Sequence, residues 1–372
     1  MTNLTPSEYT VWVTLRKVPV FAYDWVLVGL VLLINLIGLA TLYSAAPSQG
    51  VWLQQLVAFP VALAVGFLIQ MFSRRQVLSW AVPLYAVSLA MLVLVLLVGR
   101  EINGAKAWFD LGPVSFQPLE IAKIGLILVL AKVLAARPLE RLLDYVLPFL
   151  LTVPILGLVF IQPDLGGSLV LMAGLLGMLF VRGMPTHHIV LGLVAVAVLV
   201  PTVVWPHLSP YQRDRVEILF DLSKDPKGKG FQQIQSTIAI GSGGLVGKGF
   251  GAGTQTQLGF VPERQTDFIY AVLAEEWGFV GAASLLLLYA LLFFRLGRMA
   301  LECVRLEDRL VIAGVLSMLA FQVVVNIAVT LGLAPVTGLT LPLVSKGGSS
   351  LIMVYLGIGL ALLIHRDRYR EM

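Results

Sequence analysis

The chain has 372 residues, of which 58% are hydrophobic and only 13% are charged, and its formal net charge is +5. So few charged side chains cannot cover a water-soluble globule of this size, so the composition predicts a protein that sits in a membrane. The basic residues lie between apolar segments and form no stripe with interleaved aromatic side chains, which argues against a nucleic-acid partner. The single cysteine, Cys303, cannot form an internal disulfide, and we assign it no role.

Ten apolar segments follow one another along the chain, and each is suited to crossing a membrane. Their lengths fit α-helices of about 17 to 25 residues better than barrel strands of about 10. The first segment is long enough to span, so we expect it to be retained as a helix and not removed as a signal peptide. The sequence therefore predicts an all-α integral membrane protein with a single polytopic domain over residues 1–372. The predicted transmembrane helices are 25–43, 53–72, 77–98, 118–134, 146–161, 165–181, 189–205, 268–294, 310–331 and 350–364.

The distribution of lysine and arginine predicts the orientation of these helices. The short loops on one side hold only Arg100, Lys106 and Lys346, whereas the other side carries most of the basic residues. Because basic loops tend to stay in the cytoplasm, we expect both chain termini on the cytoplasmic side. The basic segments are residues 16–17, 74–75, 132–141, 182, 295–309 and 366–370.

One connection, residues 207–267 between the seventh and eighth predicted helices, is much longer than the others and is expected on the extracytoplasmic side. A loop of this length is commonly functional or disordered, and its sequence argues for a folded, partly helical loop. Ser209 and Pro210 are typical of a helix start, and the apolar residues that follow predict a helix along the membrane surface. A second helix is predicted at 231–240, before a run of glycines suited to a helix C-terminus.

Few charged residues fall inside the predicted helices, where each costs about 2.5 to 3.5 kcal/mol to insert. Glu120 and Lys123 are three residues apart near the outer end of the fourth helix, so they share a face and can form an ion pair. The pair can be purely structural or can hold a charged ligand, and the sequence leaves both open. Glu275 and Glu276 lie deeper in the eighth helix, where we expect them to pair with buried donors.

Asp267 stands at the outer start of the eighth helix, next to the glycine-rich loop. Its spacing suits an N-cap, as does that of Asp164 before the sixth helix. Asp267 can instead act as a general base, because partial desolvation at the membrane interface favours its neutral form while the helix N-terminus opposes that shift. The segment 341–350 (LPLVSKGGSS) combines Lys346 with a helix N-terminus that can cradle a phosphate, although an ordinary loop and cap fits equally well.

Four stretches of the sequence resemble, in the same order, motifs of the SEDS family (shape, elongation, division and sporulation), and the similarity extends over all ten predicted helices. They are INGAKAWFDLGPVSFQPLEIAK, IQPDLGGSL, the loop and helix from Asp221 to Gly281, and LPLVSKGGSS. The GKG followed by GTQTQLGFVPERQTDF is more similar to the RodA branch of the family than to the FtsW branch. Three positions depart from the usual pattern, namely Ala107 for arginine, Leu119 for serine and Lys346 for tyrosine.

This resemblance implies a peptidoglycan glycosyltransferase that joins lipid II units into glycan strands on the outer face of a bacterial inner membrane, during cell-wall elongation. It also implies a class B penicillin-binding protein as the partner that crosslinks the strands, and a divalent cation, Mg²⁺ or Mn²⁺, as cofactor. The family's essential aspartate corresponds to Asp267, which would take the proton from the 4-hydroxyl of the acceptor sugar. The residues expected to bind substrate are Lys106, Glu120, Lys123, Lys248, Gln257, Glu263, Arg264, Thr266, Ser345, Lys346, Ser349 and Ser350.

Two other functions remain open from the sequence. A flippase that carries lipid II across the membrane would also have many helices and an ion pair within the membrane, but it needs access from both faces. The glycines, carboxylates and lysines described above gather on one face, which favours an enzyme. A scaffold that recruits cell-wall proteins is the third possibility, and it would keep its function if Asp267 were replaced.

Overall fold

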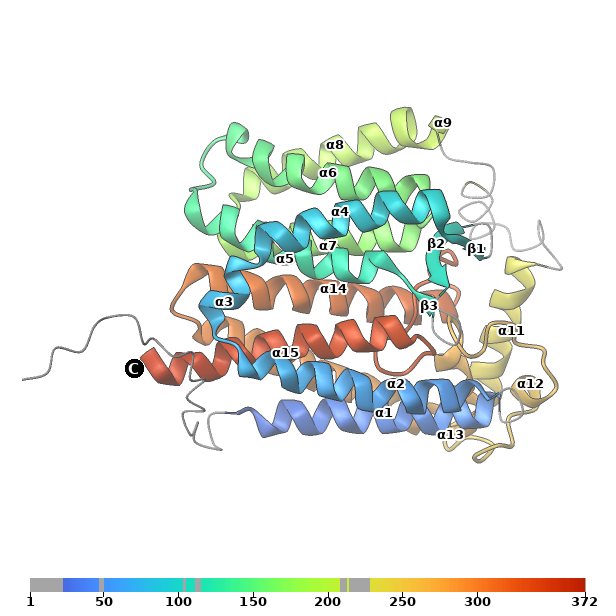
Figure 1. The fold of residues 1–372 in the computed structure, drawn as a ribbon. Coiled ribbons are helices and arrows are strands. Elements are labelled where there is room, and N and C mark those ends of the chain that lie inside the picture. Colours follow the sequence, from blue (N-terminus) through green and yellow to red (C-terminus); the bar gives the residue numbers. More distant parts are fainter. Residues whose placement is uncertain are drawn as a thin grey trace, which may run out of the picture.

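The computed structural model describes residues 23–46, 50–102, 105–110, 115–207, 213 and 228–371. Helices make up most of it and run side by side as one bundle (Figure 1), which confirms the predicted helical membrane fold. The helices are α1 (Trp25–Ala45), α2 (Val51–Leu68), α3 (Arg74–Ser79), α4 (Ala81–Val98), α5 (Pro118–Ala136), α6 (Val146–Ile161), α7 (Leu165–Arg182), α8 (Thr186–Leu199), α9 (Trp205–His207), α11 (Lys229–Ser242), α12 (Thr254–Gln257), α13 (Ile269–Glu302), α14 (Leu306–Thr330) and α15 (Gly348–Glu371). Three short 3-10 or π segments adjoin these helices, at Ile69–Met71, Leu142–Tyr145 and Val200–Val204.

Nine helical segments in the described part of the chain are long and apolar enough to cross a membrane. They match nine of the ten predicted spans. The remaining predicted span corresponds to α5, which has 19 residues but carries the charged side chains of Glu120, Lys123 and Lys132 and is not among the nine. The protein is therefore a multi-pass membrane protein, and the count of ten spans stays a prediction.

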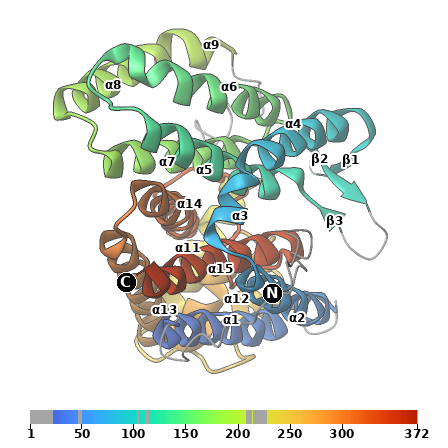
Figure 2. The same cartoon turned by 60° about the vertical axis from the view of Figure 1, so that its left-hand side comes forward.

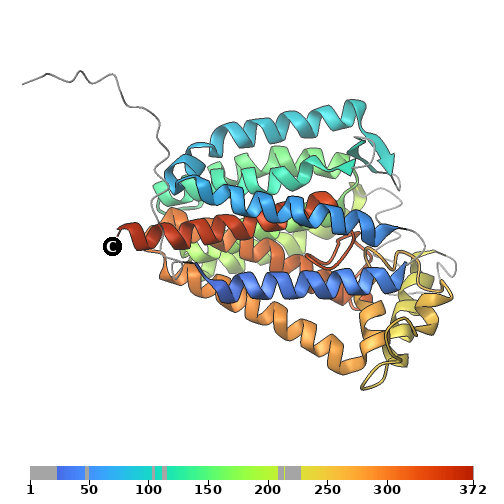
Figure 3. The ribbon, with the colours of Figure 1, turned by 60° about the horizontal axis from the view of Figure 1, so that its bottom comes forward.

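The bundle has two distinct ends. Helix α1 begins and α15 ends at the same one, which we call the C-terminal end (Figure 1). The three strands and residues 228–268, with α11 and α12, lie at the other, which we call the loop end (Figure 1, Figure 3). Because α1 begins and α15 ends at the same end of the bundle, the arrangement agrees with an even number of spans. Which end faces the cytoplasm stays a prediction.

The described part of the long loop, residues 228–267, is folded at the loop end. Helix α11 spans Lys229–Ser242 and confirms the helix predicted at 231–240. Gly244, which follows it, has a φ of 57°, in the left-handed region that glycine adopts without strain. The helix predicted from Ser209 and Pro210 lies outside the described residues, and the side of the membrane that carries this loop stays a prediction.

Helix α14 lies between two groups of helices, α4 to α9 on one side and α1, α2, α13 and α15 on the other (Figure 2). It packs against α5, α7, α13 and α15. Three of its polar residues, Gln322, Asn326 and Thr330, are spaced four apart and therefore share one helix face, and all three are buried. Polar groups inside an apolar bundle must find partners within the protein. This face of α14 is therefore expected to contact polar segments of the loops.

Between α4 and α5 the chain forms a small antiparallel sheet in the order β1-β2-β3. The strands are Arg100–Ile102, Ala105–Asp110 and Ser115–Phe116, and Glu101 lies opposite Lys106. An exposed ion pair of 2.7 Å joins Arg100 to Asp110. The all-α prediction did not include this sheet, because such short strands carry no alternating pattern long enough to recognise.

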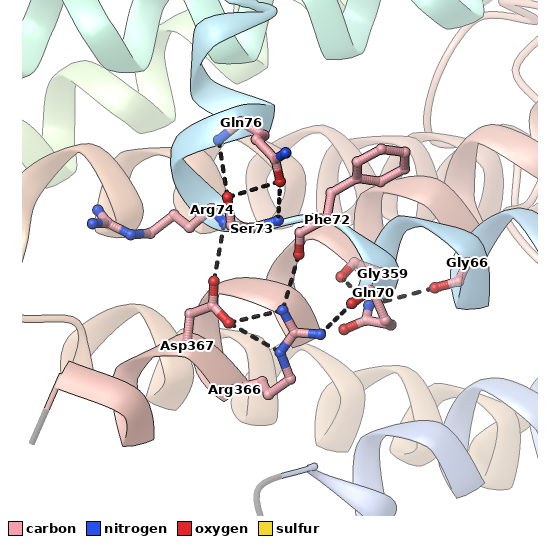
Figure 4. A network of polar contacts seen from close by, with 9 residues as sticks. All are labelled: Gly66, Gln70, Phe72, Ser73, Arg74, Gln76, Gly359, Arg366 and Asp367. Carbon is pink, nitrogen blue, oxygen red and sulfur yellow. Dashed lines mark hydrogen bonds and ion pairs between the residues drawn. The ribbon is translucent and has the colours of Figure 1, made fainter. Parts of the chain in front are cut away.

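Charged side chains at the C-terminal end tie α15 to its neighbours (Figure 4). The buried Arg366 donates from Nη2 to Asp367 at 2.8 Å and to the carbonyl of Phe72 at 3.0 Å. Asp367 accepts from the backbone N–H of Arg74 at 3.0 Å, and the Arg74 guanidinium pairs with Asp308 of α14 at 3.0 Å. Each of these buried charges has a partner, so this end of α15 is fixed against the α2–α3 connection and α14.

Candidate active site

Asp267 lies half-buried in a tight turn just before α13. The backbone N–H groups of Thr266 and Phe268 both donate to the carbonyl of Glu263, at 3.0 and 3.3 Å, and Glu263 has a φ of 49°. The Thr266 hydroxyl also donates to the Glu263 carboxylate at 2.9 Å. The N-cap position of α13 therefore falls on Phe268, one residue later than the spacing of Asp267 implies.

Phe268 anchors one flank of this turn. Its side chain is fully buried in a small apolar cluster that joins α11, α13, α14 and the loop after α14. From α11, Gln233 donates to the carbonyl of Ala334 at 2.7 Å and Ser236 donates to that of Thr330 at 2.8 Å. The long loop, the Asp267 turn and the end of α14 are therefore packed as one unit. The cluster residues are Ala239, Val261, Phe268, Ala271, Val329 and Val336.

Asn326 of α14 holds the backbone of the turn from the side of the helical core. Its side-chain amide donates to the carbonyl of Asp267 at 2.9 Å and to the carbonyl of Leu339 at 2.7 Å. The residue is buried, so no solvent competes for these bonds. Asn326 therefore sets the position of Asp267 relative to the segment that leads into α15.

Residues 341–347 lie against the same turn. The Ser345 hydroxyl donates to the carbonyl of Thr266 at 2.6 Å and accepts from the N–H of Leu341 at 2.8 Å. The N–H of Lys346 donates to the carbonyl of Gln265 at 2.8 Å. The structure thus brings together four residues that the sequence singled out separately, namely Thr266, Asp267, Ser345 and Lys346.

Side chains from three helices fix the backbone of this second segment. Gln55 of α2 donates to the carbonyl of Ser345 at 3.3 Å and accepts from the N–H of Gly347 at 3.1 Å. Asn35 of α1 donates to the carbonyl of Leu343 at 3.0 Å, and the Tyr289 hydroxyl of α13 donates to the carbonyl of Pro342 at 2.5 Å. Helix α15 then begins at Gly348, with Ser349 and Ser350 in its first turn. A phosphate cradle at this helix start stays a prediction.

Gln257 and Arg264, two further predicted ligands, connect α12 to the turn and to α1. Arg264 Nη1 donates to the carbonyl of Thr256 at 2.6 Å. Gln257 Nε2 donates to the carbonyl of Ser44, in the last turn of α1, at 3.0 Å. Both side chains are therefore bound to backbone carbonyls of neighbouring segments, and their contact with substrate stays a prediction.

Glu275 is the centre of a buried polar network on α13. Its carboxylate accepts from the Lys248 ammonium at 2.8 Å, from the N–H of Gln255 at 2.8 Å, and from the N–H and hydroxyl of Thr256 at 3.0 and 2.8 Å. Lys248 also donates to the hydroxyl of Thr254 at 2.7 Å. The predicted pairing of Glu275 with buried donors is confirmed, whereas a contact of Lys248 with substrate stays a prediction.

Glu120 and Lys123 form the predicted ion pair at 2.8 Å, and both side chains are buried. They line a cavity of about 30 Å³ between α5, α14 and α15, together with Gln322. Gln322 lies one helical turn from Asn326 on the same face of α14, so this cavity follows the polar stripe away from the Asp267 turn. The ion pair is confirmed, and its role as a ligand site stays a prediction.

Asp164 caps α7, as predicted. Its Oδ1 accepts from the N–H of Gly167 at 2.7 Å, and its Oδ2 accepts from the Gln117 amide at 3.1 Å. The same helix start is pressed against the segment that leads to Leu339, because a Cβ added to Gly166 would lie 2.7 Å from the carbonyl of Thr337. The first turn of α7 therefore packs against the segment after α14, and Asp164 links it to Gln117 at the start of α5.

Lys106 is engaged at the end of α4, where its Nζ donates to the carbonyl of Leu97 at 2.8 Å. A lysine in this position satisfies a backbone carbonyl that the helix leaves open. The neighbouring Ala107 is buried, as is Leu119 at the start of α5. Two of the three positions that depart from the SEDS pattern are therefore inside the protein, and the role of Lys106 in binding substrate stays a prediction.

Comparison with known proteins decides the family. The family model for cell cycle proteins of the FtsW, RodA and SpoVE type matches residues 16–370. The chain belongs to the FtsW, RodA and SpoVE family. The peptidoglycan glycosyltransferase MrdB of Escherichia coli (strain K12) is 39% identical over 368 residues, which cover 98% of this chain and 97% of that protein. The stage V sporulation protein E of Bacillus subtilis (strain 168) is 37% identical over 369 residues, covering 93% and 98%.

Solved structures of the FtsW, RodA and SpoVE family have the same fold. A chain of a peptidoglycan synthase complex, solved in a study of coordinated polymerization and crosslinking, superposes with a TM-score of 0.84 at 56% identity, covering 94% of this chain and 99% of that chain. The rod shape determining protein RodA of Thermus thermophilus superposes with a TM-score of 0.73 at 48% identity, covering 94% and 98%. The resemblance to the SEDS family, and to its RodA branch, is confirmed.

Asn326 and Gln55 are among the residues that hold the site of this family member and were not singled out from the sequence. Both are amide side chains inside apolar transmembrane helices, and both are buried with backbone partners from distant segments. A polar amide is costly in such a position unless it is bound, so the sequence carried a signal for both. The segment that each one binds depends on the tertiary fold.

The fit of a divalent cation to this FtsW, RodA and SpoVE family member depends on how many ligands the protein supplies. Across the described ranges, no three side chains of the types His, Cys, Asp and Glu lie close enough together to hold a metal ion. Mg²⁺ is often held by one or two carboxylates together with substrate phosphates and water. The predicted cation fits this site only if substrate phosphates and water supply most of its ligands. Asp267 is the candidate carboxylate ligand, and the cation stays a prediction.

Proposed function

We propose that this member of the FtsW, RodA and SpoVE family is a peptidoglycan glycosyltransferase that polymerises lipid II, with Asp267 as the general base. A relative named as a peptidoglycan glycosyltransferase aligns with almost the whole chain. The observation that carries the assignment of the base is the fixed backbone of its turn, whose carbonyls are bound by Asn326 and Ser345. A general base must be held where the proton will be, and this turn supplies that positioning.

The reaction needs one group that accepts a proton. The 4-hydroxyl oxygen of the acceptor sugar forms a bond to the anomeric carbon of the donor, and the bond from that carbon to the lipid diphosphate breaks. The hydroxyl proton passes to the Asp267 carboxylate, and the electron pair of the broken bond leaves with the diphosphate. Because a diphosphate leaves without being protonated, the site needs no second carboxyl group as an acid, unlike the pair of carboxylates in glycoside hydrolases.

Positive groups near the turn would stabilise the charge that develops on the diphosphate. The backbone N–H of Lys346 binds the carbonyl of Gln265, and Arg264 is part of the turn itself. The backbones of both residues therefore lie close to that of Asp267. The first backbone N–H groups of α15, beside Ser349 and Ser350, add the favourable field of a helix N-terminus. Lys106 and the Glu120–Lys123 ion pair would make more remote contacts with the substrate, and of these only the two lysines add positive charge. A divalent cation would add further positive charge at the diphosphate.

The proposed reaction takes place on the outer face of the bacterial inner membrane, with both termini in the cytoplasm. The excess of basic residues in the connections at the C-terminal end supports this orientation. A class B penicillin-binding protein is the proposed partner. The similar chain from a peptidoglycan synthase complex that coordinates polymerization and crosslinking supports an association of this kind.

The flippase alternative is not favoured. The relative named above for its activity, MrdB of Escherichia coli, is a peptidoglycan glycosyltransferase. The groups around Asp267 gather at the loop end, whereas the described buried charges at the C-terminal end, such as Arg74 and Arg366, are paired with carboxylates. A transport path needs polar groups that open to both faces in turn. A scaffold alone would have no use for the fixed turn around Asp267.

The test uses the full chain purified with a class B penicillin-binding protein that has no glycosyltransferase of its own, in detergent and with labelled lipid II. Detergent micelles have no two compartments, so transport alone yields no product there. We expect glycan polymer from the complex and none from the partner alone. A folded, partner-bound sample that leaves lipid II unchanged would overturn the proposal.

A further inference from the structure

Two polar contacts between α1 and α13 mark the ends of α1. At the C-terminal end, Asp24 caps α1 and its carboxylate accepts from Arg295 Nε at 2.9 Å. At the loop end, the Ser44 hydroxyl donates to the Glu276 carboxylate. Helix α1 has 21 residues, which rise about 32 Å and so match a hydrocarbon core of about 30 Å. The level of Ser44 and Glu276 therefore marks the edge of the hydrocarbon at the loop end.

Helix α13 is broken at this level, at Gly278, which has a φ of 66° and a ψ of −164°. The helix, orange in Figure 3, changes direction at the loop end. A break frees backbone groups that lipid cannot bind, and here loop residues 244–249 bind them. The four hydrogen bonds run from Lys248 N–H to Glu275 O (3.1 Å), Gly249 N–H to Glu276 O (3.0 Å), Phe279 N–H to Gly244 O (2.9 Å) and Val280 N–H to Leu245 O (3.1 Å).

The loop and the helix backbone lie too close together for side chains between them. A Cβ on Gly247 would lie 2.1 Å from the carbonyl oxygen of Glu276, and a Cβ on Gly278 would lie 2.2 Å from the nitrogen of Gly247. Both glycines also have a positive φ, which disfavours any other residue. The loop is therefore fixed beside α13 at the edge of the hydrocarbon, and its depth follows that of the helix.

Apolar side chains on this loop continue the lipid-facing surface of α13. Leu245 is 72% and Val246 is 81% exposed, and they adjoin Phe279 and Val280 of α13, which are 66% and 58% exposed. These α13 residues belong to a membrane-spanning segment. A contiguous apolar surface of this kind is unfavourable in water. Because Phe279 and Val280 already face lipid, the adjoining side chains of Leu245 and Val246 are placed to do the same.

An aromatic pair extends the same surface. Phe250, at the end of the loop, is exposed and stacks on Tyr43 of α1, with 6.3 Å between ring centroids and 5° between ring planes. Tyr43 also makes an edge contact with Trp52 of α2 at 5.3 Å. Tyrosine and tryptophan are enriched at the boundary between lipid tails and headgroups. The one lysine of the loop, Lys248, points inward to the buried Glu275 and so leaves the outward surface apolar.

We propose that residues 244–250 form a re-entrant loop whose apolar side chains, Leu245, Val246 and Phe250, insert among the lipid acyl chains of the leaflet at the loop end. The occupant of this surface is bilayer lipid, because the loop continues a surface that already faces lipid and lies at the same depth. The insertion holds the following segment, with α12 and the Asp267 turn, at the membrane surface. This inference does not depend on the proposed enzymatic function.

Spin-label accessibility in nanodiscs of phosphatidylethanolamine and phosphatidylglycerol tests the insertion. The full chain with Cys303→Ala carries a single nitroxide at Val246→Cys, and its collisions with oxygen, which partitions into lipid, are compared with those of a water-soluble nickel chelate. Leu287→Cys, exposed in the middle of α13, is the lipid control, and Glu101→Cys, exposed on β1, is the aqueous control. Val246→Cys replaces an exposed side chain, so folding should be unaffected. Phe250→Cys provides a second labelling site.

The expected result is that the label at Val246 collides preferentially with oxygen, as at Leu287. Equal access of the nickel chelate at Val246 and Glu101 would show that the loop lies in water and would overturn the proposal. Protection from both probes would show that protein covers the surface, for instance a second copy of this chain, and would overturn it as well. The same outcomes apply to Phe250.

Discussion

Replacing Glu275 should release the long loop from α13 without unfolding the bundle. Its carboxylate binds one ammonium, two backbone N–H groups and one hydroxyl, all within 3.0 Å, from Lys248, Gln255 and Thr256. In Glu275→Ala these donors lose their acceptor. Breaking a fully buried ion pair by removing one partner costs about 3 to 5 kcal/mol, since the other charge stays behind; the Lys248 side chain is 25% exposed, so the cost here should lie in the lower part of that range, about 3 to 4 kcal/mol. Glu275→Gln keeps one acceptor oxygen and should cost less.

Hydrogen–deuterium exchange of the purified protein in nanodiscs measures this effect locally. At about 1.4 kcal/mol per factor of ten, the amides of residues 244–257 should exchange about 10² to 10³ times faster in Glu275→Ala. Amides in the middle of α1 and α14 should keep the wild-type rate. Glu101→Ala, which removes an exposed carboxylate on β1, is the matched control and should leave the loop unchanged. Wild-type exchange of residues 244–257 in Glu275→Ala would refute the assignment of Glu275 as the anchor of the loop.

Three further predictions follow from single contacts. Asn326→Asp removes the donor that binds the carbonyl of Asp267, so glycan formation should fall while partner binding, measured by co-purification, persists; an unchanged rate would contradict a positioning role. Gly38→Ala should destabilise by about 1 to 3 kcal/mol, because its Cβ would lie 2.6 Å from Val344 Cα, whereas Gly29→Ala in the same helix meets nothing within 4 Å and should leave the thermal midpoint unchanged. Burial raises the pKa of Cys303 to about 12, so its thiol stays protonated at pH 8. The thiol should resist maleimide until a denaturing detergent unfolds the protein, and rapid labelling of the native protein would contradict this.

Local patterns in the sequence were sufficient for most of the helical scaffold. The apolar runs located the spanning helices, the glycines after 240 marked the end of α11, and Asp164 was recognised as the cap of α7 from its position alone. Hydrophobic length and capping are properties of neighbouring residues, so a single sequence contains them. The same is true of the Glu120–Lys123 pair, which one helical turn defines.

The parts that the sequence did not reveal depend on contacts between distant segments. Asp267 was placed as a possible cap because the closing bond of its turn, to Glu263, is not visible as a pattern. The break at Gly278 needs loop residues some thirty positions earlier to bind its freed groups. The role of Asn326 depends on Leu339 and Asp267 meeting at its amide. For these features, residue type indicated importance, and only the fold indicated the partner.

The rate of glycan formation from lipid II by the Asp267→Asn variant, in complex with its penicillin-binding partner, tests the central claim most directly. Asn keeps the shape of the side chain and cannot accept the proton, so the account predicts a loss of about 10² to 10⁴-fold with normal folding and partner binding. Asp110→Asn, which alters an exposed carboxylate on β2, is the control and should keep the wild-type rate. A rate for Asp267→Asn within a few-fold of wild type would contradict the assignment of Asp267 as the catalytic base.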